Sequence, residues 1–366
     1  MHVTVFVTEP YHTKTAYQSH IRQAQETTCC ELDPCTILGS PVGMPYRPTG
    51  KQRFCKRHAM DRAGSPKKVQ HRIICGDATE ILQGLVQQAD RFDVIIADPP
   101  YNIGKDFGTG STPMPLPDYA EWAAGWINSC LDLLTRSGLL YVYGFSEVLA
   151  HVAVRYAPGM QRWLVWHYTN KTVPSYKFWQ RSHETILCLW NPDHARPNLE
   201  LDQIREPYTA SFLSNAAGRK RKDTPSRYGK RGRDTVYKAH AKGALPRDVI
   251  KVPALAGGAG RSERWFMCRT CACAVYPPSH LAHHRDHDTF KHPTQKPGEL
   301  TRKLIRSRIS GQAGRVLIPF AGSGSECVVA RDLGIDFVGI EINPDYVSFA
   351  EQWLARSSKE AEPCTA

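Results

Sequence analysis

Residues 92–101 read Phe92-Asp93-Val94-Ile95-Ile96-Ala97-Asp98-Pro99-Pro100-Tyr101, a segment with a strong structural signal. Apart from Asp93, its first six residues are apolar and mostly β-branched, as in a strand buried on both faces of a parallel sheet. The two prolines have no N–H to donate and therefore end the strand. The sequence predicts a rigid bend at the carboxyl end of a central strand, where open α/β sheets bind ligands.

This bend carries groups that suit an exocyclic amine. Asp98 and the Pro99 carbonyl only accept hydrogen bonds, so together they can bind both hydrogens of an NH2 group. Tyr101 can stack on the planar ring that bears the amine. For these four residues taken alone, a strand that ends in a tight proline turn is the alternative.

A second strand, turn and helix lie near the C-terminus. Residues 314–318 predict a strand, residues 320–325 a glycine turn and residues 326–333 a helix. The glycines let the backbone come close to a ligand at the N-terminus of this helix. The next strand, 336–340, ends at Glu341, where a carboxylate is placed to accept hydrogen bonds from ribose hydroxyls. A dinucleotide fingerprint requires glycine where Cys327 stands, so the pattern argues against NAD or FAD and suits S-adenosylmethionine.

The segment His292-Pro293-Thr294-Gln295-Lys296-Pro297 precedes a helix expected from Gly298 to about Ser310. Thr294 fits the N-cap position and Pro297 the first turn, so a helix start alone would explain the segment. Earlier in the chain, residues 72–75 predict a short strand and 78–87 a helix with one apolar side, which Asp77 could cap.

Together these segments resemble the β group of DNA amino-methyltransferases, and the resemblance covers about residues 72–354. Asp98-Pro99-Pro100-Tyr101 resembles the catalytic motif, and residues 320–325 with 339–343 resemble the cofactor motif. The resemblance implies a doubly wound, mostly parallel, Rossmann-like α/β sheet that binds S-adenosyl-L-methionine. The family usually has an acidic residue where this chain has Ile318, which leaves one polar contact near the cofactor's methionine end in doubt.

The resemblance also implies residue roles. Asp98, Pro99, Pro100 and Tyr101 would be catalytic. Thr294 and Lys296 would hold the carboxylate end of the cofactor, and Asp77 would accept a hydrogen bond from its adenine amine. The full cofactor-binding set is Gly76, Asp77, Ala78, Asp98, Thr294, Lys296, Phe320, Gly322, Ser323, Gly324, Ser325, Glu341 and Ile342.

Composition limits the class of protein. The chain has 366 residues, 41% of them hydrophobic, which is enough for one large core and an extra module. A net charge of +12 suggests a polyanionic partner. No segment is long and apolar enough for a transmembrane helix, and the first residues do not form a signal peptide, so we expect a cytoplasmic, nucleoid-associated protein. The 12 cysteines are therefore better interpreted as thiols or zinc ligands than as disulfides.

The N-terminal extension, residues 1–70, does not resemble part of the sheet. It contains Cys30, Cys35, Cys55 and His58, two close pairs joined by a loop, which is a zinc-binding pattern. We therefore expect a small zinc knuckle there, with a leader carrying incidental cysteines as the alternative. After this extension we expect a catalytic half at residues 71–190, an insertion at 191–291, a cofactor-binding half at 292–358 and a tail at 359–366.

Two further segments flank the expected catalytic bend. Residues 103–117 are rich in Gly, Thr and Pro and predict a mobile loop over the site. The helix expected from Asp118 repeats apolar residues at helical spacing, including Trp122 and Trp126. We interpret these tryptophans as core residues, not as a platform for stacking bases.

The insertion is polar and basic, and by resemblance it is the target-recognition region. We expect its cations to contact DNA phosphates and bases. The candidate DNA-binding residues are Arg219, Lys220, Arg221, Lys222, Arg227, Lys230, Arg231 and Arg233.

The insertion also contains a second set of candidate zinc ligands. Cys268 and Cys271, followed by His283 and His287, have a spacing close to that of a Cys2His2 finger. Several other cysteines and histidines nearby compete for the four places, and a histidine-rich loop without metal is the alternative.

The sequence thus predicts a methyltransferase that transfers a methyl group from S-adenosylmethionine to the N6 amine of adenine in duplex DNA. The target base must leave the helix, because its amine is otherwise paired. Cytosine N4 is the alternative target, although a serine more often precedes the prolines in that branch. A zinc-bearing DNA-binding regulator with an inactive fold is the alternative of a different class. The resemblance also implies a homodimer.

Overall fold

The computed structural model describes residues 70–104, 113–170, 174–194, 196–215, 217–221, 235–255, 263–271 and 275–356. The expected zinc ligands of the N-terminal extension, Cys30, Cys35, Cys55 and His58, lie outside these residues, as does the tail. That zinc site therefore stays a prediction.

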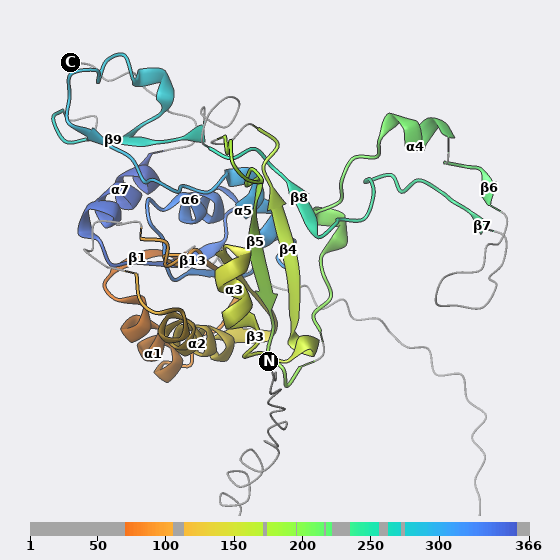
Figure 1. Ribbon diagram of the computed structural model, residues 1–366, viewed down its shortest axis with the longest axis horizontal. Coiled ribbons are helices and arrows are strands. Elements are labelled where there is room, and N and C mark those ends of the chain that lie inside the picture. The colour runs from red at the N-terminus through yellow and green to blue at the C-terminus, as the bar shows by residue number, and fades with distance from the viewer. Residues whose placement is uncertain are drawn as a thin grey trace, which may run out of the picture. The chain divides into compact units, whose positions relative to one another are not determined.

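A single sheet of eight strands forms the centre of the described chain (Figure 1). In spatial order its strands are β1 (His71–Cys75), β13 (Asp336–Glu341), β12 (Arg315–Ile318), β2 (Phe92–Ala97), β3 (Leu134–Gly144), β5 (His183–Leu189), β4 (Gln161–His167) and β8 (Val249–Lys251). Neighbours from β1 to β3 are parallel, β5 is antiparallel to both β3 and β4, and β8 is parallel to β4. The mostly parallel α/β sheet that the sequence predicts is confirmed.

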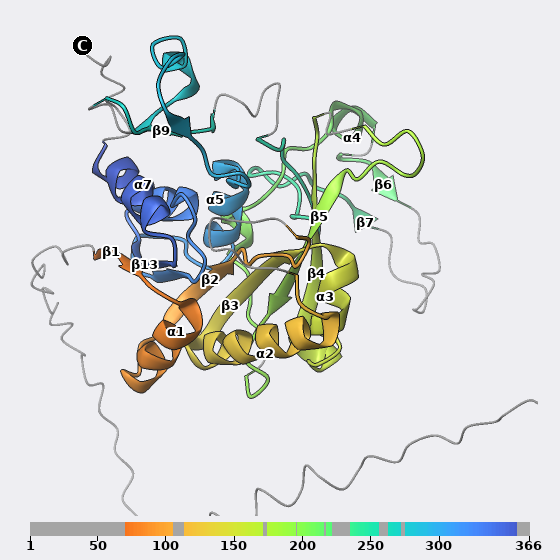
Figure 2. The same ribbon diagram turned by 60° about the vertical axis from the view of Figure 1, so that its left-hand side comes forward.

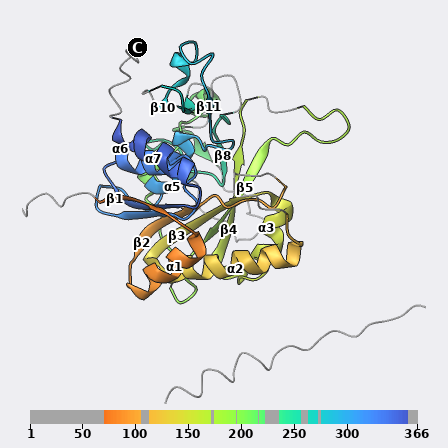
Figure 3. The same ribbon diagram turned by 90° about the vertical axis from the view of Figure 1, so that its left-hand side faces the viewer.

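Helices cover both faces of this sheet (Figures 2 and 3). One face carries α1 (Ala78–Gln87), α2 (Leu116–Asp132) and α3 (Ser146–Ala153), and the other carries α5 (Gly298–Arg306), α6 (Ser325–Asp332) and α7 (Pro344–Ala355). Because apolar layers lie on both sides, β2 is almost entirely buried, and residues 94–97 have no exposed area. Strand β2 lies beside β12, with Val94 opposite Val316 and Ile95 opposite Leu317.

Local sequence signals set most element boundaries. Helix α1 has the predicted bounds, and the Asp77 carboxylate accepts hydrogen bonds from the N–H groups of Thr79 (2.7 Å) and Glu80 (3.4 Å). The expectation that Thr294 caps the next helix is wrong. Helix α5 begins at Gly298, Pro297 occupies the N-cap position, and no side chain caps the helix.

The insertion is less regular than the sheet. Its strand β8 forms the edge of the main sheet, and α4 (Ala210–Asn215), β6 (Lys220–Arg221) and β7 (Thr235–Val236) lie on an arm that extends away from β8 (Figure 1). A separate small sheet has the order β10 (Val275–Tyr276), β9 (Phe266–Cys268), β11 (Thr289–Phe290). The short 3-10 helices are η1 (Pro158–Met160), η2 (Leu201–Gln203) and η4 (Pro278–His280). No helix in the described part of the chain has the length and apolar character needed to span a membrane.

Candidate functional site

The carboxyl ends of four neighbouring parallel strands, β1, β13, β12 and β2, meet at one edge of the sheet. Glu341, the last residue of β13, and Gly76, Gly322 and Asp98, which follow the other three strands, line one cavity of about 540 Å³. This size is within the usual range for small-molecule sites. The predicted catalytic bend and the predicted glycine turn, more than two hundred residues apart in sequence, therefore share one cavity.

Most of the predicted site residues line this cavity. They are Gly76, Asp77, Ala78, Asp98, Pro99, Pro100, Tyr101, Thr294, Lys296, Phe320, Gly322, Ser325, Glu341 and Ile342. Ser323 and Gly324, which the resemblance also assigns to the cofactor, are not in the cavity wall. Gly324 has φ +80°, and a Cβ atom there would lie 2.6 Å from the Cβ of Ala350. Glycine is therefore required at this position for packing against α7.

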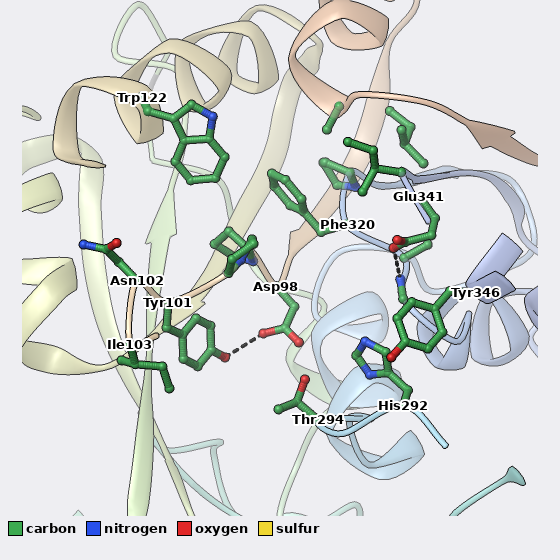
Figure 4. Close-up of a pocket in the computed structure, with 18 of the residues that line it drawn as sticks. Asp98, Tyr101, Asn102, Ile103, Trp122, His292, Thr294, Phe320, Glu341 and Tyr346 are labelled. Atoms are coloured by element: carbon green, nitrogen blue, oxygen red, sulfur yellow. Dashed lines mark hydrogen bonds between the residues drawn. The ribbon is translucent and has the colours of Figure 1, made fainter. Parts of the chain in front are cut away.

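The predicted catalytic bend is held by an ion pair and by hydrogen bonds, of which Figure 4 shows the one between Tyr101 and Asp98. The Tyr101 hydroxyl donates to Asp98 Oδ1 at 2.6 Å, and Lys296 Nζ lies 2.8 Å from Asp98 Oδ2. The Tyr119 hydroxyl donates to the Pro100 carbonyl at 2.8 Å. Because the ammonium of Lys296 is already paired with Asp98, the cofactor-binding role implied for this lysine stays a prediction.

Glu184, at the start of β5, is a second carboxylate at this site that the sequence analysis missed. Its Oε2 lies 2.9 Å from the Tyr101 hydroxyl oxygen, whose single hydrogen Glu184 shares with Asp98, and 3.5 Å from Lys296 Nζ. Its Oε1 accepts a hydrogen bond from Tyr168 at 2.7 Å. No local signal marks Glu184, because its proximity to Asp98 depends on the antiparallel pairing of β5 with β3.

Burial and nearby charges have opposing effects on the pKa values of Asp98 and Lys296. Burial raises the pKa of Asp98, Lys296 lowers it, and Glu184 raises it further, so the net shift is upward. Burial alone would lower the pKa of Lys296, but Asp98 and Glu184 more than offset this and raise it above its ordinary value. The two carboxyl groups therefore favour the charged form of Lys296, which lies between them.

The cofactor side of the cavity is organised by Glu341. Its Oε2 accepts the N–H of Gly322 at 2.7 Å, and its Oε1 accepts the N–H of Asn343 at 2.9 Å. Gly322 has φ +53°, and a Cβ atom there would lie 2.7 Å from Nε2 of His292. The glycine therefore lets the turn pass close to His292, which lines the cavity together with Tyr346 (Figure 4).

Glu326, in the first turn of α6, is another carboxyl group that the sequence analysis missed. It lines the cavity, is 3% exposed and accepts a hydrogen bond from the Ser325 hydroxyl at 2.7 Å. Burial, followed by the nearby Asp98, raises the pKa of Glu326 to about 7. Ile318, where the resemblance leads one to expect an acid, is a buried residue of β12.

The tryptophans of α2 have different environments. Trp126 is fully buried, as predicted, whereas Trp122 is half-buried, packs against the core and also lines the cavity, so the interpretation of Trp122 as a core residue holds but is incomplete. Helical spacing could not separate the two, because both face the same side of α2. At the entrance, Asn102 donates to the Met114 carbonyl and accepts from its N–H, both at 2.8 Å. These bonds join the residue before the expected mobile loop, 103–117, to Met114 within it, and residues 105–112 of the loop lie outside the described ones.

The structure describes the predicted DNA-binding residues only in part. Arg219 and Lys220 are exposed on the arm, and Arg221 belongs to β6. Lys222, Arg227, Lys230, Arg231 and Arg233 lie outside the described residues. Their contact with DNA stays a prediction.

The predicted ligand set of the second zinc site requires one correction. Cys268, Cys271 and His287 do gather, but the fourth residue of the cluster is His284 and not His283. The spacing of a Cys2His2 finger favours His283, whereas the turns between residues 281 and 287 bury His284 and leave His283 exposed.

Comparisons with known proteins agree with this site. Residues 92–352 match the family model described as DNA methylase. Type II methyltransferase M.HpaI of Haemophilus parainfluenzae is 26% identical over 290 residues, which cover 78% of this chain and 74% of that protein. DNA adenine methyltransferase YhdJ of Escherichia coli strain K12 is 29% identical over 279 residues, which cover 75% of this chain and 79% of that protein.

Among solved structures, the PvuII DNA methyltransferase, which is cytosine-N4-specific, has the same fold. Its TM-score is 0.50 at 14% sequence identity, and the match covers 79% of this chain and 87% of that one. At this identity the likeness concerns the fold alone. Since the DNA methylase model extends over most of the chain and includes both motifs of the cavity, the chain belongs to the family of DNA amino-methyltransferases.

Proposed function

We propose that this protein transfers a methyl group from S-adenosylmethionine to the N6 amine of a flipped adenine in a specific sequence of duplex DNA. The observation that carries the proposal is the cavity itself. Asp98, Pro99 and Tyr101 form one wall, and Phe320, Gly322 and Glu341 form the neighbouring wall. One cavity can therefore hold an amine and a methyl donor side by side.

The second wall fits S-adenosylmethionine. The Glu341 carboxylate is fixed by two backbone N–H groups, and its remaining lone pairs can accept hydrogen bonds from ribose hydroxyls. Phe320 and Ile342 offer apolar surface for an adenine ring, and Asp77 lies at the same end of the sheet. Among the predicted cofactor-binding residues, Gly76, Ala78, Thr294 and Ser325 also line the cavity.

The first wall fits the reacting amine. When bound, the cofactor supplies a methyl group on a positively charged sulfur. Asp98 and the Pro99 carbonyl would accept the two amine hydrogens, which leaves the nitrogen lone pair directed at that methyl group. Transfer of the methyl group to this lone pair would leave the cofactor's sulfur neutral, and the nitrogen would then release one proton. The raised pKa of Asp98 suits it to receive this proton.

The hydrogen bond from Tyr101 and the ion pair with Lys296 would hold the Asp98 carboxylate in place. Each carboxylate oxygen has two lone pairs, so Oδ2 can accept the amine without losing Lys296. None of the six cysteines among the described residues is needed as a nucleophile, because the transfer is direct.

Cytosine N4 is the second candidate, since the PvuII methyltransferase with this fold is cytosine-N4-specific. Asp98 before the two prolines, together with the relative named as a DNA adenine methyltransferase, favours adenine. The regulator with an inactive fold is disfavoured, because Asp98, Tyr101, Lys296 and Glu341 are all present and lie in the cavity.

Methylation-sensitive sequencing of DNA from cells that express the protein, with nucleoside mass spectrometry, tests the proposal. We expect N6-methyladenine in one sequence context. Asp98→Ala should lower the rate of methylation about 10³-fold or more, since the variant loses the charged acceptor of the amine. Asp132→Ala, which removes an exposed carboxylate at the end of α2, should leave the rate unchanged.

Detection of N4-methylcytosine would instead support the second candidate, cytosine-N4 methylation. Unmodified DNA would refute both candidates. The homodimer implied by the resemblance also belongs to this proposal. Light scattering of the purified protein should give twice the chain mass of 41.1 kDa.

A further inference from the structure

The cluster of Cys268, Cys271, His284 and His287 lies outside the cavity and has no role in the proposed reaction. Its two sulfur atoms are 3.3 Å apart, and Nδ1 of His284 is 3.2 Å from Nδ1 of His287. The Cys268 sulfur is 3.5 Å from Nδ1 of His287, and the Cys271 sulfur is 3.5 Å from Nδ1 of His284. All four ligand atoms lie within 4.8 Å of one another.

These distances fit a tetrahedral zinc ion. Zn–S bonds of about 2.3 Å and Zn–N bonds of about 2.0–2.1 Å give tetrahedral edges of about 3.8 Å between sulfurs, about 3.6 Å between sulfur and nitrogen and about 3.3 Å between nitrogens. The four distances given above lie within about 0.5 Å of these values, and the two remaining sulfur-nitrogen distances are no longer than 4.8 Å. Two thiolates with two imidazoles in this geometry favour zinc over harder cations.

The surrounding fold supports the same interpretation. The sheet β10-β9-β11 has a small core of its own, consisting of Phe266, Cys268 and Tyr276 with partly buried neighbours. The His284 ring stacks on Tyr276 at 3.7 Å between centroids, so its orientation is fixed. Segments with so little apolar surface are commonly stabilised by a metal.

We propose that Cys268, Cys271, His284 and His287 bind one structural zinc ion that stabilises the small sheet next to the cavity. The position of the sheet gives the ion a consequence for the active site. Strand β11 ends two residues before His292, and the His292 ring contacts Tyr346 at 4.7 Å between centroids. Both rings line the cavity. Trp265, just before β9, stacks on Trp353 of α7 at 5.1 Å.

Metal analysis of the purified full chain, prepared under reducing conditions without chelators, tests the site. His284→Ala should contain one equivalent of zinc less than the wild type. His283→Ala is the matched control, because it removes the adjacent, exposed histidine and should retain the wild-type content. Comparing the variants cancels any zinc held by the N-terminal extension. Equal zinc in the two variants would overturn the proposal.

A second measurement uses the wild type alone and does not depend on how a variant folds. Zinc-bound thiolates resist alkylation, so Cys268 and Cys271 should react at least 10-fold faster with iodoacetamide after zinc is removed by a chelator, as followed by peptide mass spectrometry. Rates that are insensitive to the chelator, or a disulfide between the two residues, would refute the site. Neither readout depends on methylation.

A different region carries a second inference. The loop between β4 and β5 exposes Tyr176 (92%), Phe178 (79%) and Trp179 (87%). Three such side chains within four residues form an unusual apolar surface for a protein, and surfaces of this kind mark binding sites. Figure 3 shows this hairpin extending beyond the sheet from β5.

The two ends of this loop are joined to the catalytic group. The N–H of Tyr168 donates to the Ser182 carbonyl at 2.8 Å, and the Tyr168 hydroxyl donates to Glu184, which contacts Tyr101. Arg181 lies over the ring of Phe145 at 4.1 Å, and Phe145 lines the cavity. The base of the loop that carries the exposed aromatic residues is therefore anchored to groups that line the cavity proposed to receive the target base.

We infer that this loop inserts an aromatic side chain into the DNA stack as the target base leaves it. The inference rests on the proposed function. A flipped base leaves a gap, and apolar side chains inserted between base steps offset the lost stacking. Lys177 is exposed between Tyr176 and Phe178 and could contact DNA phosphates beside the inserted ring. The net charge of +12 of the chain also favours binding to DNA.

Duplexes with 2-aminopurine at the target position, in the sequence context found by methylation-sensitive sequencing, test this inference. Base flipping raises the fluorescence of this analogue. Trp179→Ala should reduce the increase at least 5-fold and lower kcat/KM for duplex DNA about 10-fold, with unchanged Kd for the cofactor. Val154→Ala, which removes an equally exposed apolar side chain from the end of α3, should change neither.

Unaltered flipping by Trp179→Ala, Phe178→Ala and Tyr176→Ala would refute this role while leaving the proposed methylation intact. A shift of these variants from dimer to monomer with unaltered flipping would assign the loop to a second copy of the chain instead. An abasic site opposite the target removes the cost of unpairing, so it should restore the activity of Trp179→Ala to within about 2-fold of the wild type.

Discussion

Asp98 and Glu326 are two buried carboxyl groups of one cavity with different partners. Asp98 has the Lys296 ammonium at 2.8 Å and the Tyr101 hydroxyl at 2.6 Å. Glu326 has a hydroxyl partner in Ser325, and no lysine or arginine of the described residues is within ion-pairing distance of it. The catalytic side therefore contains its own cation, whereas the cofactor side has a carboxyl group that a cationic ligand could pair with.

The difference is consistent with the two proposed ligands. A target amine is neutral, so its acceptor must be oriented in advance by the protein. S-adenosylmethionine carries positive charge, so a carboxyl group without a cationic partner can become part of its binding site. The following predictions test this contrast.

Replacing Lys296 with methionine should have the largest effect. Asp98 and Glu184 would then remain buried without a cation, which should lower the free energy of unfolding by about 3–5 kcal/mol and abolish methylation at pH 7. Denaturant unfolding and a methylation assay measure the two effects. Lys303→Met is the matched control. It breaks a more exposed pair with Glu206 and should cost about 1 kcal/mol or less. Similar losses in both variants would contradict the special role of Lys296.

Replacing Glu326 with glutamine should change how stability depends on pH. The folded-state pKa of Glu326 is about 7, above its ordinary value of 4.5, so the folded protein holds this proton more tightly than the unfolded chain. Stability from this group is therefore fully present below about pH 4.5 and is lost as pH rises to about 7. The glutamine variant should be more stable than the wild type by about 3 kcal/mol at pH 8 and equally stable at pH 4.5. Parallel stability curves for the two proteins would contradict this.

The same substitution should alter cofactor binding by a smaller amount. If ionised Glu326 pairs with the cationic cofactor, the Kd of the wild type should fall about 10-fold more between pH 6 and pH 8 than that of Glu326→Gln. The variant shares every titration of the cofactor itself, so the difference reports on Glu326. Calorimetry in buffers of different ionisation enthalpy should also show more proton release on binding in the wild type than in Glu326→Gln. Identical pH profiles would show that Glu326 does not contact the cofactor's charge.

Much of the fold and the site follows from local sequence. The apolar run ending in Asp98-Pro99-Pro100, the glycine turn at 320–325 and the helix at 78–87 each contain their own signal, since strand, turn and cap preferences depend on neighbouring residues. The order of the strands then brings the motifs together, because carboxyl ends of parallel strands share an edge.

The remaining site residues depend on contacts that no local pattern encodes. Glu184 reaches Asp98 only because β5 is antiparallel to β3. Trp122 and Trp126 have the same helical spacing, yet only Trp122 reaches the cavity. A turn and stacking on Tyr276 place His284, and not His283, beside the two cysteines. The ligand spacing of zinc fingers could not predict this.

The adjacency of β12 and β2 has a consequence for how the gene could be rearranged. These strands are neighbours although one belongs to the last part of the chain and the other to the first, and α7 packs against β1 at the opposite end of that half. A circular permutant that starts before His292, continues through α7 and is joined by a linker to Gln70 would keep every strand pairing of the sheet. The order of the two halves along the polypeptide is thus separable from the active site they build together.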